Sequence, residues 1–123
     1  MTYVSGFVIP VPSDRKEDYR AMAAEAATMF RDYGALEIME AWGEDVRDGK
    51  QTDFRRAVQA KEGETVVFSW IVWPDRATAD AAETRMLADD KMTPPADVPF
   101  DMARMIFGGF SPIFQMGRTG GDQ

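Results

Sequence analysis

One carboxylate in this 123-residue chain stands on an otherwise apolar strand face, and it is the best single candidate for chemistry. Glu40 shares strand parity with Ile38 and Trp42, so its side chain is expected to be partly desolvated. Desolvation raises the pKa of a carboxyl group, which could then act as a general base. The competing and simpler expectation is an ion pair with a nearby arginine. Glu40 is therefore a candidate catalytic residue without an assigned reaction.

Four further side chains could contribute to a ligand site. Ser69 lies in an apolar strand, and without a base to activate its hydroxyl a hydrogen bond within the sheet is the favoured expectation. Arg104 could grip an anionic ligand, although an ion pair with Asp101 that fixes a loop is favoured. Trp42 and Trp73 could form an aromatic wall around a ligand, but packing in the core or an interface is the simpler expectation.

Histidine and cysteine are both absent, and their absence excludes much chemistry. A Ser-His-Asp triad, a zinc-thiolate site and an imidazole-ligated haem all require one of them. Neither a metal nor another cofactor is expected as an intrinsic component. Carboxylates do gather around the end of the second predicted strand, at Glu37, Glu40, Glu44, Asp45 and Asp48. The calcium-loop pattern is missing there, so a solvated acidic surface is favoured over a metal site.

The charge and hydropathy patterns limit the partners and the location. A formal net charge of −7 with scattered basic residues argues against nucleic-acid binding, which needs clustered lysine and arginine. The N-terminus lacks the features of a signal peptide, and the longest apolar run is about nine residues, too short to cross a bilayer. A soluble, cytoplasmic protein without a membrane partner is the expectation.

Hydrophobic periodicity predicts two strand-helix-strand units within a single domain spanning residues 1–116. Ser13 or Asp14 could cap the first helix, and Gly34 could end it. The predicted elements are strand 2–11, helix 13–33, strand 35–42, a polar connection 44–64, strand 65–73, a second helix from 74 to 87, a loop 89–104, strand 105–114 and a disordered tail 117–123. A bulge or a close backbone contact is expected at Gly108-Gly109.

This order predicts a ferredoxin-like α+β fold, βαββαβ, with a four-stranded antiparallel sheet and two helices on one face. The strand Thr65–Trp73 is apolar on both of its faces, so the face without helices also needs cover. Such an exposed apolar face would exceed what monomers usually tolerate. A homodimer in which two open sheet faces meet is therefore predicted.

Several strings in the chain resemble one protein family. They are Y-V-S-G-F (3–7), G-A-L-E (34–37), E-T-V-V-F-S-W-I-V-W (64–73), V-P-F-D (98–101) and R-M-I-F-G-G-F (104–110). Together they resemble the YbaA-like bacterial family of unknown function, over about residues 2–114. The resemblance implies a ferredoxin-like monomer and the sheet-to-sheet dimer of the dimeric α+β barrel superfamily. It brings no established activity. The chain departs from the family pattern at Ser5, where an acid is common, and at Trp73 and Phe107, where tyrosine is common.

Two functions remain open. One is a homodimeric small-molecule-binding or stress-associated module without catalysis of its own. The other is a cofactor-independent monooxygenase or isomerase acting on an aromatic or polyketide-like compound. In either case the ligand site is expected inside the monomer, between the first helix and the sheet. The alanine-rich second helix, Ala77–Ala82, is expected to leave room there beside Trp42 or Trp73.

Overall fold

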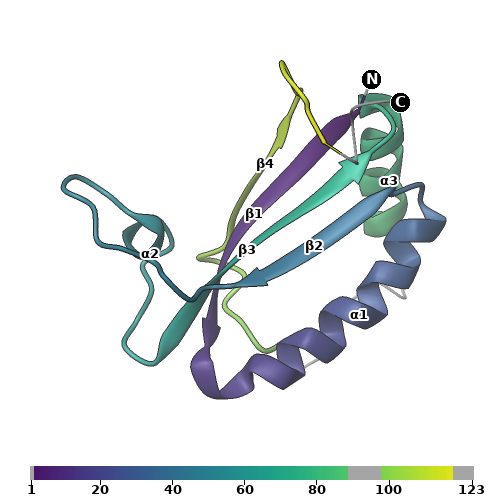
Figure 1. Ribbon diagram of the computed structural model, residues 1–123. Helices are drawn as coiled ribbons and strands as arrows, with labels where there is room; N and C mark the ends of the chain where they lie inside the picture. Colours follow the sequence, from purple (N-terminus) through teal and green to yellow (C-terminus); the bar gives the residue numbers. More distant parts are fainter. Residues whose placement is uncertain (1, 89–97, 118–123) are drawn as a thin grey trace.

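The computed structural model describes residues 2–88 and 98–117 (Figure 1). Within these residues it has four strands, three α-helices and one 3-10 turn: β1 (Tyr3–Pro12), η1 (Ser13–Arg15), α1 (Lys16–Asp32), β2 (Glu37–Trp42), α2 (Phe54–Ala57), β3 (Glu64–Trp73), α3 (Arg76–Ala88) and β4 (Ile106–Phe110). The predicted tail, apart from Gly117, and most of the predicted loop 89–104 lie outside the described residues. The α+β class predicted from the sequence is confirmed.

The strands form one antiparallel sheet in the order β2-β3-β1-β4. β3 pairs along its whole length with β1, and its residues 67–72 also pair with β2. Its β-branched and aromatic residues suit such a doubly paired strand. β4 adds to the free side of β1. The predicted four-stranded antiparallel sheet is therefore confirmed.

The last strand is shorter than predicted. It ends at Phe110, because Pro112 follows closely and lacks the N–H that would extend the ladder. Gly108 and Gly109 pair regularly with β1, so the structure has the predicted close contact rather than a bulge. A β carbon on Gly109 would collide with the hydroxyl of Tyr3, which explains the glycine at this position.

The first helix begins later than predicted. Ser13 and Asp14 belong to η1, and α1 begins at Lys16 without a side-chain cap, so the predicted cap is wrong. The Ser13 hydroxyl instead hydrogen-bonds the Thr65 hydroxyl at 2.7 Å, which ties the start of the helical segment to β3. The predicted C-terminal glycine is present, since Gly34 has the left-handed φ of 111° after the helix end.

Helices α1 and α3 pack on one face of the sheet and form its core (Figure 1). Trp73 and Ile71 contact the α3 alanines Ala79 and Ala82 at one end. At the other end Val67 lies in a cluster with Tyr19 of α1 and with two β1 residues, Ile9 and Val11. The helix-facing residues of β3 are thus the odd-numbered ones, as strand alternation requires.

The connection between β2 and β3 was predicted only as a polar segment, and the structure adds a short helix to it. It contains α2, whose N-cap Asp53 accepts a hydrogen bond from the Arg56 backbone N–H at 2.8 Å. Phe54 of α2 makes an edge contact with Phe68 of β3, on the face opposite to α1 and α3. The connection therefore covers one end of that face, and Val66 at this end is only 3% exposed.

Candidate functional site

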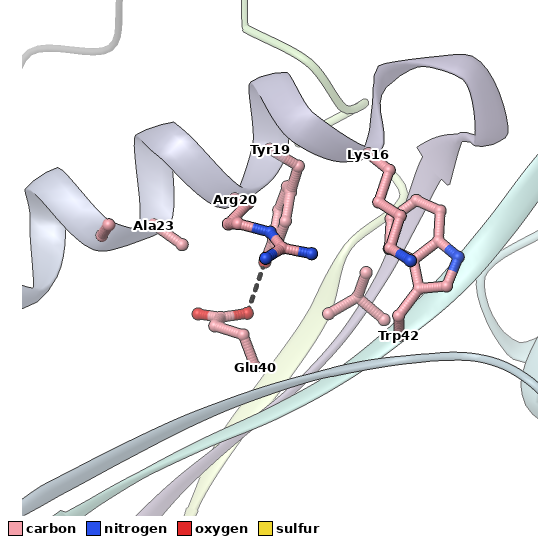
Figure 2. Close-up of a pocket in the computed structure, with 8 residues that line it drawn as sticks. Lys16, Tyr19, Arg20, Ala23, Glu40 and Trp42 are labelled. Carbon is pink, nitrogen blue, oxygen red and sulfur yellow. Dashed lines mark hydrogen bonds between the residues drawn. The ribbon is translucent and has the colours of Figure 1, made fainter.

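A cavity of about 440 Å³ lies between the first turns of α1 and the sheet (Figure 2). This size lies within the range of small-molecule sites in proteins. Eight residues line it: Lys16, Tyr19, Arg20, Ala23 and Ala24 from α1, Glu40 and Trp42 from β2, and Val67 from β3. The cavity therefore joins charged, hydroxyl, aromatic and aliphatic groups in one place.

The two elements place these groups together through their own periodicities. The lining residues of α1 recur at intervals of three and four, which puts them on one helical face. Glu40 and Trp42 are two apart in β2 and so point to the same side of the sheet. Because Ala23 and Ala24 are small, the helix does not fill the space above the strand. The alanines of the second helix were expected to leave room beside Trp42 or Trp73. The cavity does lie beside Trp42, but Ala79 and Ala82 are buried in the core against Trp73 and do not line it.

A hydrogen-bonded chain of three side chains borders the cavity: Tyr19 and Glu40 line it, and Ser69 lies outside the lining as the cross-strand partner of Glu40. The Tyr19 hydroxyl donates to Oε1 of Glu40 at 2.7 Å (Figure 2), and the Ser69 hydroxyl donates to the same carboxyl group. Tyr19 and Ser69 are buried, with 4% and 3% exposure, whereas solvent reaches Glu40 through the cavity. Both buried hydroxyls thus have a partner, and both are oriented toward Glu40.

The environment of Glu40 shifts its titration. Loss of hydration raises the pKa of the Glu40 carboxyl, and the hydrogen bonds from Tyr19 and Ser69 oppose this shift. Burial also raises the pKa of the Tyr19 hydroxyl, with a further contribution from the adjacent carboxylate. Tyr19 therefore remains a proton donor in its hydrogen bond throughout the physiological range. Glu40 is the group that can change its charge.

Two cations stand at the α1 side of the cavity. The ammonium of Lys16 lies over the ring of Trp42, 5.6 Å from its centroid. The Arg20 guanidinium is exposed and pairs with the equally exposed Glu17 at 3.3 Å. Figure 2 shows both cationic groups among the residues that surround the cavity.

Among the sequence candidates, the structure brings Glu40, Trp42 and Ser69 together but not the other two. Trp73 is 3% exposed, packs against Phe30 and donates its indole N–H to the Ser5 hydroxyl at 3.0 Å, away from the cavity lining. Sequence reasoning assigned no site role to Tyr19, Lys16 or Arg20. Their three- and four-residue spacing was available as a signal, but only their register with Glu40 reveals their role.

Arg104 is also outside the cavity. Its guanidinium forms a two-point ion pair with Glu64, at 2.8 and 2.7 Å, and a third bond to Asp101 at 2.8 Å. The favoured pairing with Asp101 is therefore present. The same guanidinium also donates to the Gln59 carbonyl, so these protein groups occupy the donors that the alternative, a clamp for a ligand anion, would have used.

The ion pair of Arg104 gives a testable stability prediction. Hydrogen bonding from Arg104 lowers the pKa of Glu64 from an ordinary 4.5 to about 2. A depressed folded-state pKa contributes stability above pH 4.5, which is lost as the pH falls toward 2. We expect Arg104→Ala to lower Tm at pH 7 by about 5 °C or more, and to differ less from wild type as the pH falls. Thermal unfolding followed by circular dichroism across pH would measure both effects.

The control for this experiment is Arg47→Ala. Arg47 pairs with Asp45 at 3.1 Å, but both side chains are largely exposed, so their pair contributes little to stability. An Arg104 variant that melts no earlier than the Arg47 variant would contradict a structural role for the partly buried pair of Arg104 and Glu64.

Glu40 is expected to show the opposite pH dependence. A raised folded-state pKa contributes stability below the ordinary value of 4.5, and this contribution disappears as the pH rises through the folded-state value. Glu40→Gln keeps an acceptor for Tyr19 but does not titrate. We expect this variant to gain stability relative to wild type as the pH rises above 4.5 in urea unfolding. Glu44→Gln, which removes a carboxylate outside the cavity lining, is the matched control. A pH-independent difference for Glu40→Gln would contradict the shift.

The described residues offer neither a metal site nor a membrane span. No three acidic side chains in residues 2–88 and 98–117 come close enough to hold a metal ion, so the acidic residues from 37 to 48 do not converge on one. No helix within the same residues is long and apolar enough to cross a membrane.

The fold and the cavity define a small α+β protein with an acidic group at a solvent-accessible site. Residues 2–102 match the family described as protein of unknown function (DUF1428), and the chain belongs to this family. The uncharacterized protein YbaA of Escherichia coli K12 is 54% identical over 114 residues, covering 92% of this chain and 97% of that protein. The YbaA protein of Shigella flexneri gives the same identity and coverage. The resemblance found in the sequence strings is thereby confirmed.

A comparison with solved structures gives a de novo designed protein, Foldit4, with a TM-score of 0.45 and 15% identity. The alignment covers 91% of this chain and 99% of the designed protein.

Proposed function

We propose that the protein is a homodimeric small-molecule-binding protein whose ligand occupies the cavity between α1 and the sheet. The observation that carries the proposal is the hydrogen-bonded chain of Tyr19, Glu40 and Ser69 beside unfilled space. A carboxylate in a structural core would be packed against an arginine, as Glu64 is against Arg104. Glu40 instead lines an open cavity, where it remains able to bond a ligand.

The dimer is the second part of the proposal. We infer a ferredoxin-like domain over residues 1–116 from the strand order β2-β3-β1-β4 and the βαββαβ sequence, with α2 as an insertion. The sheet face without α1 and α3 remains apolar, and Phe68, Ile106 and Phe110 on it are 45%, 45% and 59% exposed. Meeting of two such faces would remove these side chains from water. A cytoplasmic location belongs to the same proposal and can be checked by cell fractionation.

Blocking the cavity tests the ligand site directly. Ala24 lines the cavity and is exposed, so Ala24→Trp should fill the space without disturbing the core. We expect aromatic acids or quinols that raise the Tm of wild type to lose this effect in Ala24→Trp. Ala21→Trp is the matched control, since Ala21 is exposed on the same helix but outside the lining. Shifts that survive the Ala24 change, or the lack of any shift in wild type, would refute the site.

A cofactor-independent monooxygenase or isomerase is the second candidate, and the chemistry of Glu40 favours it. A carboxylate with a raised pKa can take a proton from an enolic or phenolic ligand and return it elsewhere. Tyr19 and Ser69 would hold the carboxyl in position for this step. Glu40→Gln separates the candidates, because an enzyme would lose turnover while a binding protein would have no turnover to lose. Proton exchange into bound quinols, followed by NMR in deuterated water, would detect the acid-base step.

A further inference from the structure

We propose that the cavity selects a small aromatic carboxylate that carries a hydroxyl at its far end, with the ligand carboxylate on Lys16 and Arg20 and the hydroxyl on Glu40. This inference rests on the proposed ligand site between α1 and the sheet, and adds the chemical class of the ligand and its orientation. The sequence analysis gave no role to Lys16 or Arg20, and the family to which the chain belongs has no known function.

The charge of the lining favours an anion. Two of the eight lining residues are cationic and one is acidic. The acidic one, Glu40, already accepts hydrogen bonds from Tyr19 and Ser69. A ligand cation would therefore meet two like charges and only one carboxyl group. A ligand anion would meet two donors, and charge-assisted hydrogen bonds are the stronger kind.

Both cations are available for a ligand. Arg20 pairs only with Glu17 in the described part of the chain, across an exposed 3.3 Å contact with 67% and 74% of the side chains accessible. Such a contact contributes little, so a ligand carboxylate can replace it. Lys16 has no carboxylate partner within residues 2–88 and 98–117, and the Trp42 ring holds its ammonium beside the cavity.

The remaining lining defines the body and the far end of the ligand. Trp42, Ala23 and Val67 offer flat and aliphatic surface, which suits an aromatic ring better than a flexible chain. On the strand side, Oε1 of Glu40 is taken by Tyr19, and the carboxyl group has further acceptor capacity toward the cavity. A ligand hydroxyl would donate to it. About 440 Å³ accommodates one or two rings.

Three test compounds of matched shape examine this assignment in the full-length protein. They are 4-hydroxybenzoate, its neutral amide 4-hydroxybenzamide, and the cationic phenol tyramine, each titrated by isothermal calorimetry. We expect 4-hydroxybenzoate to bind roughly ten-fold or more tightly than the amide, and tyramine to bind weakest. Binding of the carboxylate should weaken as salt is raised, because both cations are near the surface.

Substitutions of the two cations test where the carboxylate of the ligand binds. Lys16→Met and Arg20→Met should each weaken 4-hydroxybenzoate binding by roughly ten-fold while leaving the amide unchanged. Arg20→Lys should recover part of the affinity. Arg31→Met is the matched control, because Arg31 is an exposed arginine of the same helix outside the cavity lining. Since all three positions are exposed, folding should be preserved, and circular dichroism would verify it.

The outcomes separate this inference from the proposal on which it rests. Equal binding of the amide or of tyramine, blocked by Ala24→Trp, would overturn the anion assignment and leave the cavity as the ligand site. The anion assignment also fails if Arg20→Met and Arg31→Met weaken binding alike. Binding of 4-hydroxybenzoate that survives Ala24→Trp would overturn both. Absence of binding by all three compounds would overturn the proposed ligand class.

Discussion

Replacing Trp70 by aspartate is expected to convert the proposed dimer, of twice the 13.8 kDa chain mass, into a folded monomer. Trp70 stands near the middle of β3, on the face opposite to α1 and α3, between Phe68 and Val72 on the same side of the strand. Its indole N–H donates to Glu37 at 2.8 Å. An aspartate there would add a second acid beside Glu37 and bury an unpaired charge in the interface. This should cost about 3 kcal/mol or more of dimer stability.

Light scattering coupled to size exclusion at micromolar concentration measures the mass of both forms. Leu36→Asp provides the matched control, since Leu36 is 58% exposed, directly precedes β2 and does not line the apolar groove on the open sheet face. We expect this variant to remain dimeric. A wild-type protein that elutes as a monomer, or a Trp70→Asp variant that stays dimeric, would remove the support for the sheet-to-sheet assembly.

The second large effect concerns Trp73. Trp73→Ala should lower the free energy of unfolding by about 3–5 kcal/mol, because it empties the largest side-chain position in the core between β3 and α3. Trp73→Phe keeps a ring against Phe30 but loses the hydrogen bond to Ser5, so its cost should be smaller. Urea unfolding of the three proteins gives the comparison.

The same experiment separates a core role from a ligand role. A tryptophan that lines a ligand site can usually be truncated with little loss of stability. Nearly equal unfolding free energies for Trp73→Ala and wild type would therefore show that the residue does not fill the core. Lost ligand binding with unchanged stability would return Trp73 to the candidate ligand-binding residues.

The sheet was predictable because its information is local. The apolar run of β3 and the two-residue period of β2 define which side chains share a face, so the strand parity of Glu40 and Trp42 follows from the sequence alone. The prediction of α2 failed because its four residues are too short for a helical period to emerge. Asp53 caps this helix through geometry that only the folded connection supplies.

The strand residues of the candidate site were predictable from the sequence, but the helix residues that face them were not. Parity placed Glu40 on the helix-facing side of β2, but its partner depends on the rotation and height of α1 above the sheet. Tyr19 and Arg20 are neighbours in sequence, and no local rule tells which of them reaches the carboxyl group. The interaction of Arg104, a candidate ligand-binding residue, was equally hard to predict. Its partner Glu64 lies 40 residues away in the chain. An ion pair between two residues far apart in the chain produces no repeating pattern in the sequence.

Helix α2 limits how the two sheets of the proposed dimer can be aligned. It lies at one end of the sheet face that would meet the partner, with Phe54 against Phe68 (Figure 1). A second sheet could not slide over the end that α2 occupies. The two copies would therefore be confined to the uncovered part of each face. This short helix would act as a steric stop that selects one alignment of the two sheets. None of the described hydrogen bonds and ring contacts joins it to the cavity lining.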